Sequence, residues 1–137
     1  MSLCAAAGGV LLAIAADSFT LAWTHSVERV EWRERWQVDG GSLRLVESRV
    51  QGSGAGMEPP DGAVLRDGWW VAPASLRVPA LRLAVSGATG SGWRLCIAGA
   101  GCRDLERLLQ DAGGGRRPGA IALSPGRCPG TPARSWP

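Results

Sequence analysis

The sequence predicts an all-β fold, mainly antiparallel: a small β-sandwich or partly open barrel with one short C-terminal helix. Three observations predict it. Runs in which apolar and polar residues alternate recur along the 137 residues. Clusters of Gly, Asp and Pro separate these runs, and the totals of 20 Gly and 9 Pro favour turns over long helices. The length allows one domain with a modest core.

The N-terminal segment is apolar. Residues 3–16, LCAAAGGVLLAIAA, form a run that is too short to span a bilayer comfortably. The run fits a signal peptide or a short membrane-associated segment, with residues 13–15 as a small-x-small cleavage pattern; a buried strand or helix is the alternative. We therefore expect such a segment over 1–16, a β-rich domain over 17–112 and a disordered Gly/Pro/Arg tail over 113–137.

Two alternating runs open the β-rich domain. Residues 19–25 alternate as a strand does, with the large apolar side chains and His25 on one face. Residues 30–38 have one mainly apolar face and one polar face; the apolar-phase positions are Val30, Trp32, Glu34, Trp36 and Val38, and the polar ones are Glu31, Arg33, Arg35 and Gln37. A helix is the alternative for this run, because Glu31 and Arg35 would pair at i,i+4. The clean division by parity favours a strand.

Turn signals divide the rest of the domain. Asp39-Gly40-Gly41 precedes a strand at 42–50, whose apolar residues fall on both faces and predict a central strand covered on both sides. A Gly-rich loop follows. The further expected elements are two short strands within 63–72, an edge-like segment between Pro73 and Pro79, strands at 81–86 and 93–98, and a helix over 102–112 that ends at Gly113.

Charge is unevenly distributed. Residues 17–111 contain eleven Arg and twelve Asp or Glu, whereas the last 26 residues contain four Arg and no acid. The net charge of +3 therefore comes from the tail. A nucleic-acid-binding domain should carry a basic face on its folded part, so we expect no nucleic-acid partner.

The cysteines predict one disulfide. Cys96 and Cys102 are separated by the flexible stretch IAGAG, which lets them bridge in an oxidising compartment. Removal of a signal peptide would take Cys4 with it and leave Cys128 free. A zinc site is the rival interpretation, but one His and no close CxxC pair argue against it. We expect neither a metal nor another cofactor.

The one hint of chemistry lies at His25 and Glu34, which both occupy the apolar-phase faces of predicted strands. Two registers are open: Glu34 lies opposite Leu21, with Trp23 opposite Trp32, or Glu34 lies directly opposite His25. A buried carboxylate is costly unless it is paired, and an imidazole or a guanidinium is its natural partner.

Three interpretations of this stretch follow. The first is a core polar pair that sets the hairpin register. The second is a pocket or docking surface lined by His25, Ser26, Glu28 and Glu34. The third is a hydrolase that uses His25, although His25 and Ser26 would point to opposite faces of a strand and cannot serve each other directly.

Three stretches resemble the small bacterial family catalogued as domain of unknown function 1850: FTLAWTHSVERVEWRERWQV, LRLVESRVQGSGAGMEPP and DGWW. The resemblance covers about residues 19–98. The matching residues are His25, Ser26 and Glu28 of HSVE, the acids Glu34 and Glu47, and Gly54, Gly56 and Met57 of GAGM. The resemblance implies export and association with TRAP transporters of the TAXI class, which are ion-coupled uptake systems with a periplasmic binding protein. It implies no established activity.

We therefore expect a non-catalytic, periplasmic or otherwise exported accessory domain. It would dock on the membrane subunit or the solute receptor of such a transporter through the turn at His25–Glu28 and the loop at Gly54–Met57; Glu34 and Glu47 are further candidate binding residues. Contact with the membrane is expected only through the N-terminal segment or the partner. A periplasmic small-ligand-binding module is the alternative, and an unrecognised hydrolase the second alternative.

Overall fold

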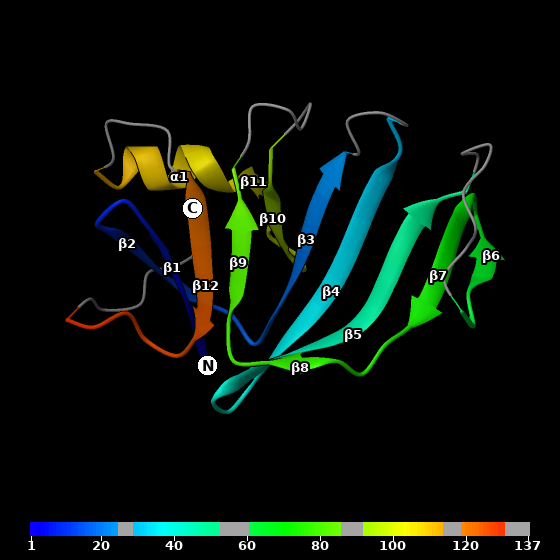
Figure 1. Cartoon of the computed structure of the whole chain (residues 1–137), viewed down its shortest axis with the longest axis horizontal. Helices are drawn as coiled ribbons and strands as arrows, with labels where there is room; N and C mark the ends of the chain where they lie inside the picture. The colour runs from blue at the N-terminus through cyan, green and yellow to red at the C-terminus, as the bar shows by residue number, and fades with distance from the viewer. Residues whose placement is uncertain (25–28, 53–60, 86–91, 114–118, 131–137) are drawn as a thin grey trace.

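The computed structural model describes residues 1–24, 29–52, 61–85, 92–113 and 119–130. Within these ranges the chain forms antiparallel strands and one short helix (Figure 1). The elements are β1 (Ser2–Ala7), β2 (Val10–Ala15), β3 (Ser18–Thr24), β4 (Glu31–Asp39), β5 (Ser42–Gln51), β6 (Val64–Arg66), β7 (Trp69–Pro73), β8 (Arg77–Val78), β9 (Leu81–Ala84), β10 (Arg94–Ile97), β11 (Gly101–Asp104), α1 (Leu105–Asp111) and β12 (Ala120–Pro125).

The strands form two sheets. The small sheet has four strands in the order β2-β1-β12-β9. The large sheet has eight described strands, in the order β11-β10-β3-β4-β5-β7-β6, with β8 paired to β5. Neither sheet closes on itself, and apolar side chains of both meet in one core. The prediction of a small, mainly antiparallel β-sandwich with a short helix is confirmed.

The centre of the large sheet is the meander β3-β4-β5. β3 and β4 pair with Trp23 opposite Trp32, so residues 31–39 form a strand and the helix alternative is wrong. A two-residue turn, Gly40-Gly41, joins β4 to β5. Gly40 has a φ of 60°, which glycine adopts without a steric penalty and which suits a tight hairpin.

A β-bulge explains the mixed pattern of β5. The register between β4 and β5 shifts in mid-strand and leaves Val46 without a partner in register. Alternation restarts after the bulge, so Leu45 and Val50 share one side of the sheet although their numbers differ in parity. The prediction that β5 is covered on both sides is wrong, because Arg49 on its other side is exposed.

The two ends of the chain meet in the small sheet. The apolar segment at residues 2–15 forms the hairpin β1-β2, with Leu3 fully buried, and β1 pairs with β12. This is the buried-strand alternative for the N-terminal segment; its cleavage stays a prediction. The prediction of disorder over 113–137 is wrong for residues 120–125, because they form β12. The apolar side chains of Ile121 and Leu123 in this strand are fully buried in the core.

Two disulfides are formed. Cys96 and Cys102 lie directly opposite each other on β10 and β11, which confirms the predicted pair. Cys4 of β1 bonds to Cys128, so the expectation that Cys128 is free is wrong. That expectation rested on the loss of Cys4 with a signal peptide, whereas β1 is part of the fold here.

The helix is shorter than predicted because β11 includes residues 101–104. Asp104 is the N-cap: its carboxylate accepts hydrogen bonds from the backbone N–H of Glu106 (3.1 Å) and of Arg107 (3.3 Å). Leu105 and Leu109 are buried on one side of the helix. Among the described residues, no helix has the length and apolar character that a membrane crossing needs.

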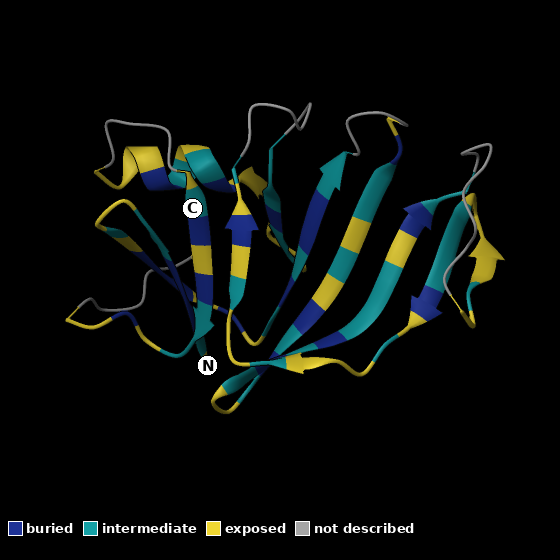
Figure 2. Cartoon of the chain, in the orientation of Figure 1, coloured by how far each residue is buried: buried dark blue, intermediate teal, exposed yellow. Residues whose placement is uncertain are grey.

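Burial is concentrated where the small sheet and α1 face the large sheet, and it thins toward β6 at the far edge (Figure 2). The large sheet, the small sheet and α1 all contribute to the core. The largest fully buried side chains include Phe19, Leu21, Leu43, Leu95, Leu105 and Ile121. The other side of the β3-β4-β5 meander has no second sheet and carries mostly polar side chains. The large sheet therefore presents a core-facing side and a polar side.

Candidate functional site

The strands that lead to the two predicted docking motifs, β3 and β5, terminate at the same end of the large sheet, which we call the docking edge. β3 leads into residues 25–28 and β5 leads into residues 53–60, and these strands run in the same direction on either side of β4. His25, Ser26, Glu28, Gly54, Gly56 and Met57 themselves lie outside the described residues. What the structure provides is the position of the strands that lead to them (Figure 1).

The residues that flank these motifs have constrained backbones. Arg29 has a φ of 55°, which is unusual for a residue with a side chain and commonly marks a tight turn or a functional site. Gly52 donates a backbone hydrogen bond to Gly68 at 2.7 Å, and a Cβ at Gly52 would lie 2.8 Å from Leu65 Cδ1. A larger residue at this position would be crowded by Leu65 and by the Gly68 carbonyl oxygen at 3.1 Å, so the end of β5 lies close against the β6-β7 turn.

Glu34 lies on the core-facing side of β4, with Leu21 of β3 directly opposite on one flank and Ser48 of β5 on the other. The first of the two open registers is therefore the one formed, and Glu34 does not face His25 directly. Burial raises the pKa of the Glu34 carboxyl above its ordinary value of 4.5, and the nearby Trp36 side chain partly opposes the rise. The predicted partner of this carboxylate is thus absent from the register position opposite it.

Tryptophans surround this carboxyl along the strand. Trp32 and Trp36 are two residues away on either side of Glu34, and their ring N–H groups are buried with no hydrogen bond of ordinary geometry in the described part of the chain. Trp32 stacks on Trp23 with ring centres 6.2 Å apart, and Trp93 lies 4.9 Å from Trp23. The core-facing side near the docking edge is therefore aromatic and carries one half-buried carboxyl.

Glu47 lies on the other side of the sheet. Its carboxylate is 2.6 Å from Arg49 Nε and 3.8 Å from a guanidinium nitrogen of Arg35. The sequence analysis grouped Glu34 and Glu47 in one set of binding residues, but the structure places them on opposite sides of the same sheet. The difference arises from the bulge, which changes which parity of β5 faces the core.

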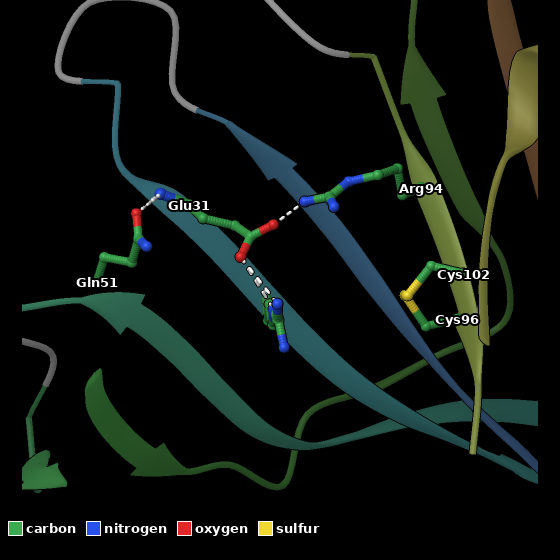
Figure 3. A network of polar contacts seen from close by, with 6 residues as sticks. Glu31, Gln51, Arg94, Cys96 and Cys102 are labelled. Atoms are coloured by element: carbon green, nitrogen blue, oxygen red, sulfur yellow. Dashed lines mark hydrogen bonds and ion pairs between the residues drawn. A yellow bond between two sulfur atoms is a disulfide. The ribbon is translucent and has the colours of Figure 1, made fainter. Parts of the chain in front are cut away.

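A second carboxylate on this polar side, Glu31, organises a network near the docking edge (Figure 3). Its backbone N–H donates to Gln51 Oε1 at 2.8 Å, and its carboxylate pairs with Arg33 at 3.0 Å and with Arg94. The network joins β4 to β5 and to β10 across the sheet. The Cys96–Cys102 disulfide lies nearby on β10 and β11.

Sequence reasoning did not select the arginines of this polar side. Arg33, Arg35 and Arg49, with Thr20 and Glu47, line an open depression of about 370 Å³. Alternation over residues 31–37 predicts a fully polar face but does not by itself indicate a binding site. The convergence of β4 arginines with Arg49 requires the bulged register, which the sequence does not reveal.

Groups suited to metal binding or nucleophilic catalysis are few among the described residues. They contain no cluster of three or more His, Cys, Asp or Glu side chains that could hold a metal ion. Ser48, one nucleophile that a hydrolase could use, lies opposite Glu34, but a serine needs a base such as an imidazole, and the sole histidine is outside the described ranges. All four cysteines are in disulfides, which removes them as nucleophiles.

Comparison with protein families identifies the relatives of this chain. The family model described as Domain of unknown function (DUF1850) matches residues 19–105. The chain belongs to this family. The match begins at β3 and ends at the first residue of α1, so it contains the large sheet's central meander, Glu34, the arginine depression and both predicted docking motifs. No curated protein and no solved structure matches the chain.

Proposed function

We propose that this DUF1850 domain is an exported, non-catalytic accessory of a TRAP-type uptake transporter of the TAXI class. It docks on the membrane subunit or the solute receptor through the sheet edge at which β3 and β5 end. The observation that carries the proposal is that β3 and β5, the strands that precede the family motifs HSVE and GAGM in the sequence, end at this same edge. A partner that recognises both motifs would therefore dock at this edge.

Two further features support this proposal. Both disulfides suit an oxidising compartment, which agrees with an exported domain. The edge is held from three directions: by the close approach of Gly52 to the β6-β7 turn, by the hydrogen bond from Glu31 to Gln51, and by the stacked Trp23 and Trp32. A rigid edge reduces the conformational entropy that docking would cost.

The test is co-purification with the membrane subunit and, separately, with the solute receptor encoded beside the domain. His25→Ala and Met57→Ala alter the two motifs. Leu76→Ala is the matched control, because Leu76 is exposed on the connection between β7 and β8 at the opposite end of β5. Capture of the wild type and of the Leu76 variant, with loss in the two motif variants, supports the proposal.

Other outcomes count against it. Equal capture of all four proteins, with circular dichroism showing that each is folded, would move the contact away from this edge. Failure of the wild type to capture either transporter component, under conditions in which those two components bind each other, would reject the transporter role.

Glu34 favours a second candidate, a small-ligand-binding module. A half-buried carboxyl with a raised pKa, flanked along its strand by two buried indole N–H groups, is typical of a polar anchor in an otherwise apolar binding site. A ligand that binds there should raise the melting temperature of the wild type and have no effect on Glu34→Gln. A compound library screened by thermal shift against both proteins tests this candidate.

A further inference from the structure

The polar side of the large sheet carries an excess of positive charge at one place. The arginine depression, defined above as Thr20, Arg33, Arg35, Glu47 and Arg49, contains three guanidinium groups and one carboxylate. All three arginine side chains are about half exposed, at 46, 55 and 46% for Arg33, Arg35 and Arg49. The depression therefore has two positive charges that no lining carboxylate balances.

The pairing register of β4 and β5 places like charges opposite each other, which lowers the stability of the sheet. Arg33 of β4 and Arg49 of β5 are direct cross-strand partners. Side chains in such positions leave the backbone about 5 Å apart, and like charges directly opposite each other destabilise a sheet. Glu31 holds Arg33 and Glu47 holds Arg49, so each arginine of the pair has a separate carboxylate partner.

The arginines are positioned for a ligand. The guanidinium of Arg33 lies 4.9 Å from the centre of the Trp69 ring and is held by Glu31, and Arg49 is held by Glu47 at 2.6 Å. Arg35 contacts Glu47 only at 3.8 Å, beyond hydrogen-bond distance, and so keeps its donors available. Thr20, opposite Arg35 on β3, adds a hydroxyl. Two fixed guanidiniums, one adaptable guanidinium and a hydroxyl line the same depression.

We propose that the arginine depression binds a small anion that carries at least two carboxylate or phosphate groups. Guanidinium groups bind such groups through paired, charge-assisted hydrogen bonds, which are stronger than neutral ones. The volume of about 370 Å³ lies within the range of small-molecule sites. The absence of a large apolar residue among the five lining side chains directs the choice to a small, highly charged ligand rather than an amphipathic one.

This site is independent of the proposed docking function. It lies in the middle of β4 and β5 on the polar side, whereas Glu34 is on the core-facing side and the proposed docking edge is where β3 and β5 end. Loss of one function therefore does not predict loss of the other.

Isothermal titration of the full chain, with both disulfides formed, tests the proposal. The probes are citrate, inorganic phosphate, acetate and a short polyglutamate peptide. We expect citrate to bind more tightly than phosphate, acetate to show no measurable binding, and citrate affinity to fall as salt screens the charges. Arg35→Gln and Arg49→Gln should each weaken citrate binding by about tenfold or more, which is the loss of one charge-assisted hydrogen bond.

Two further variants make the test specific. Arg82→Gln removes one exposed arginine from β9 in the small sheet and should leave citrate affinity within about twofold, because Arg82 does not line the depression. Arg35→Lys keeps the charge but loses the planar fork, so it should bind citrate with intermediate affinity.

Three results would overturn the proposal. The first is no citrate binding by the wild type at low salt. The second is equal citrate affinity in the wild type, Arg35→Gln and Arg49→Gln. The third is binding of polyglutamate without binding of citrate or phosphate, which would assign the depression to an acidic partner protein instead.

Discussion

The two sides of the β3-β4-β5 meander are built from alternate residues of the same strands, yet their charged groups lie in opposite environments, one largely buried and the other exposed to water. On the core-facing side a single carboxyl, Glu34, lies between Leu21 and Ser48, and burial shifts its pKa. On the polar side, Arg33 and Arg49 face each other half-exposed in water. The comparison teaches that one step along a strand decides whether a charge is governed by desolvation or by its neighbours.

The largest expected effect tests this comparison at two consecutive residues of β3 that lie on opposite sides of the sheet. Leu21 is 1% exposed and part of the main core, so Leu21→Ala should cost about 2–5 kcal/mol of unfolding free energy. Thr20 faces the polar side, and Thr20→Ala should cost no more than about 1 kcal/mol. Urea unfolding monitored by tryptophan fluorescence measures both. Equal losses would mean that the two sides do not differ in burial as described.

A smaller effect concerns the pH dependence that Glu34 introduces. Burial raises the pKa of the Glu34 carboxyl in the folded protein above its ordinary value of 4.5. At a pH between these two pKa values, the folded protein holds a proton that the unfolded chain has already released. The contribution of Glu34 to the unfolding free energy should therefore be largest below pH 4.5 and be lost as the pH rises through the raised pKa. Glu34→Gln removes the titrating group, so its stability should decline less over the same pH window.

Urea titrations of both proteins at a series of pH values measure this difference. Asp61→Asn, which removes an exposed carboxyl, is the control and should follow the wild type. Parallel curves for the wild type and Glu34→Gln would show that water reaches the Glu34 carboxyl freely, and the contrast between the two sides would lose its basis.

The smallest effect sharpens the comparison on the polar side. Arg35 has a half-exposed side chain and a carboxylate contact of only 3.8 Å, so Arg35→Gln should change the unfolding free energy by less than about 0.5 kcal/mol. The same variant should lose citrate affinity. A large loss of stability in Arg35→Gln would instead make this arginine a structural element of the sheet.

Local patterns predicted most of the large sheet. The alternation of residues 30–38 and the Asp-Gly-Gly turn identified β4 and its hairpin, and a leucine stripe followed by Gly113 identified the helix. The small sheet was missed because its pairing is between distant parts of the chain. β12 pairs with β1 more than a hundred residues away, and nothing local in AIAL at 120–123 indicates that partner.

The candidate site was predicted only in part. Parity correctly placed Glu34 on the core-facing side, but the turn SVER did not decide between two registers that differ in what lies opposite it. Parity also failed across the bulge at Val46, which moved Glu47 and Arg49 to the polar side. The arginine depression depends on this shift and on a three-strand register. Such features arise from tertiary pairing, which single-strand patterns do not encode.

The Cys4–Cys128 disulfide joins residues 124 positions apart and so turns most of the chain into a covalent ring. A single backbone cut anywhere between the two cysteines opens that ring without releasing a fragment. The nicked protein would keep its full mass on a non-reducing gel and separate into two pieces only after a thiol reductant is added. For the exported domain proposed above, the ring would give tolerance of a first proteolytic cut, and it results from the meeting of the two chain ends in one sheet.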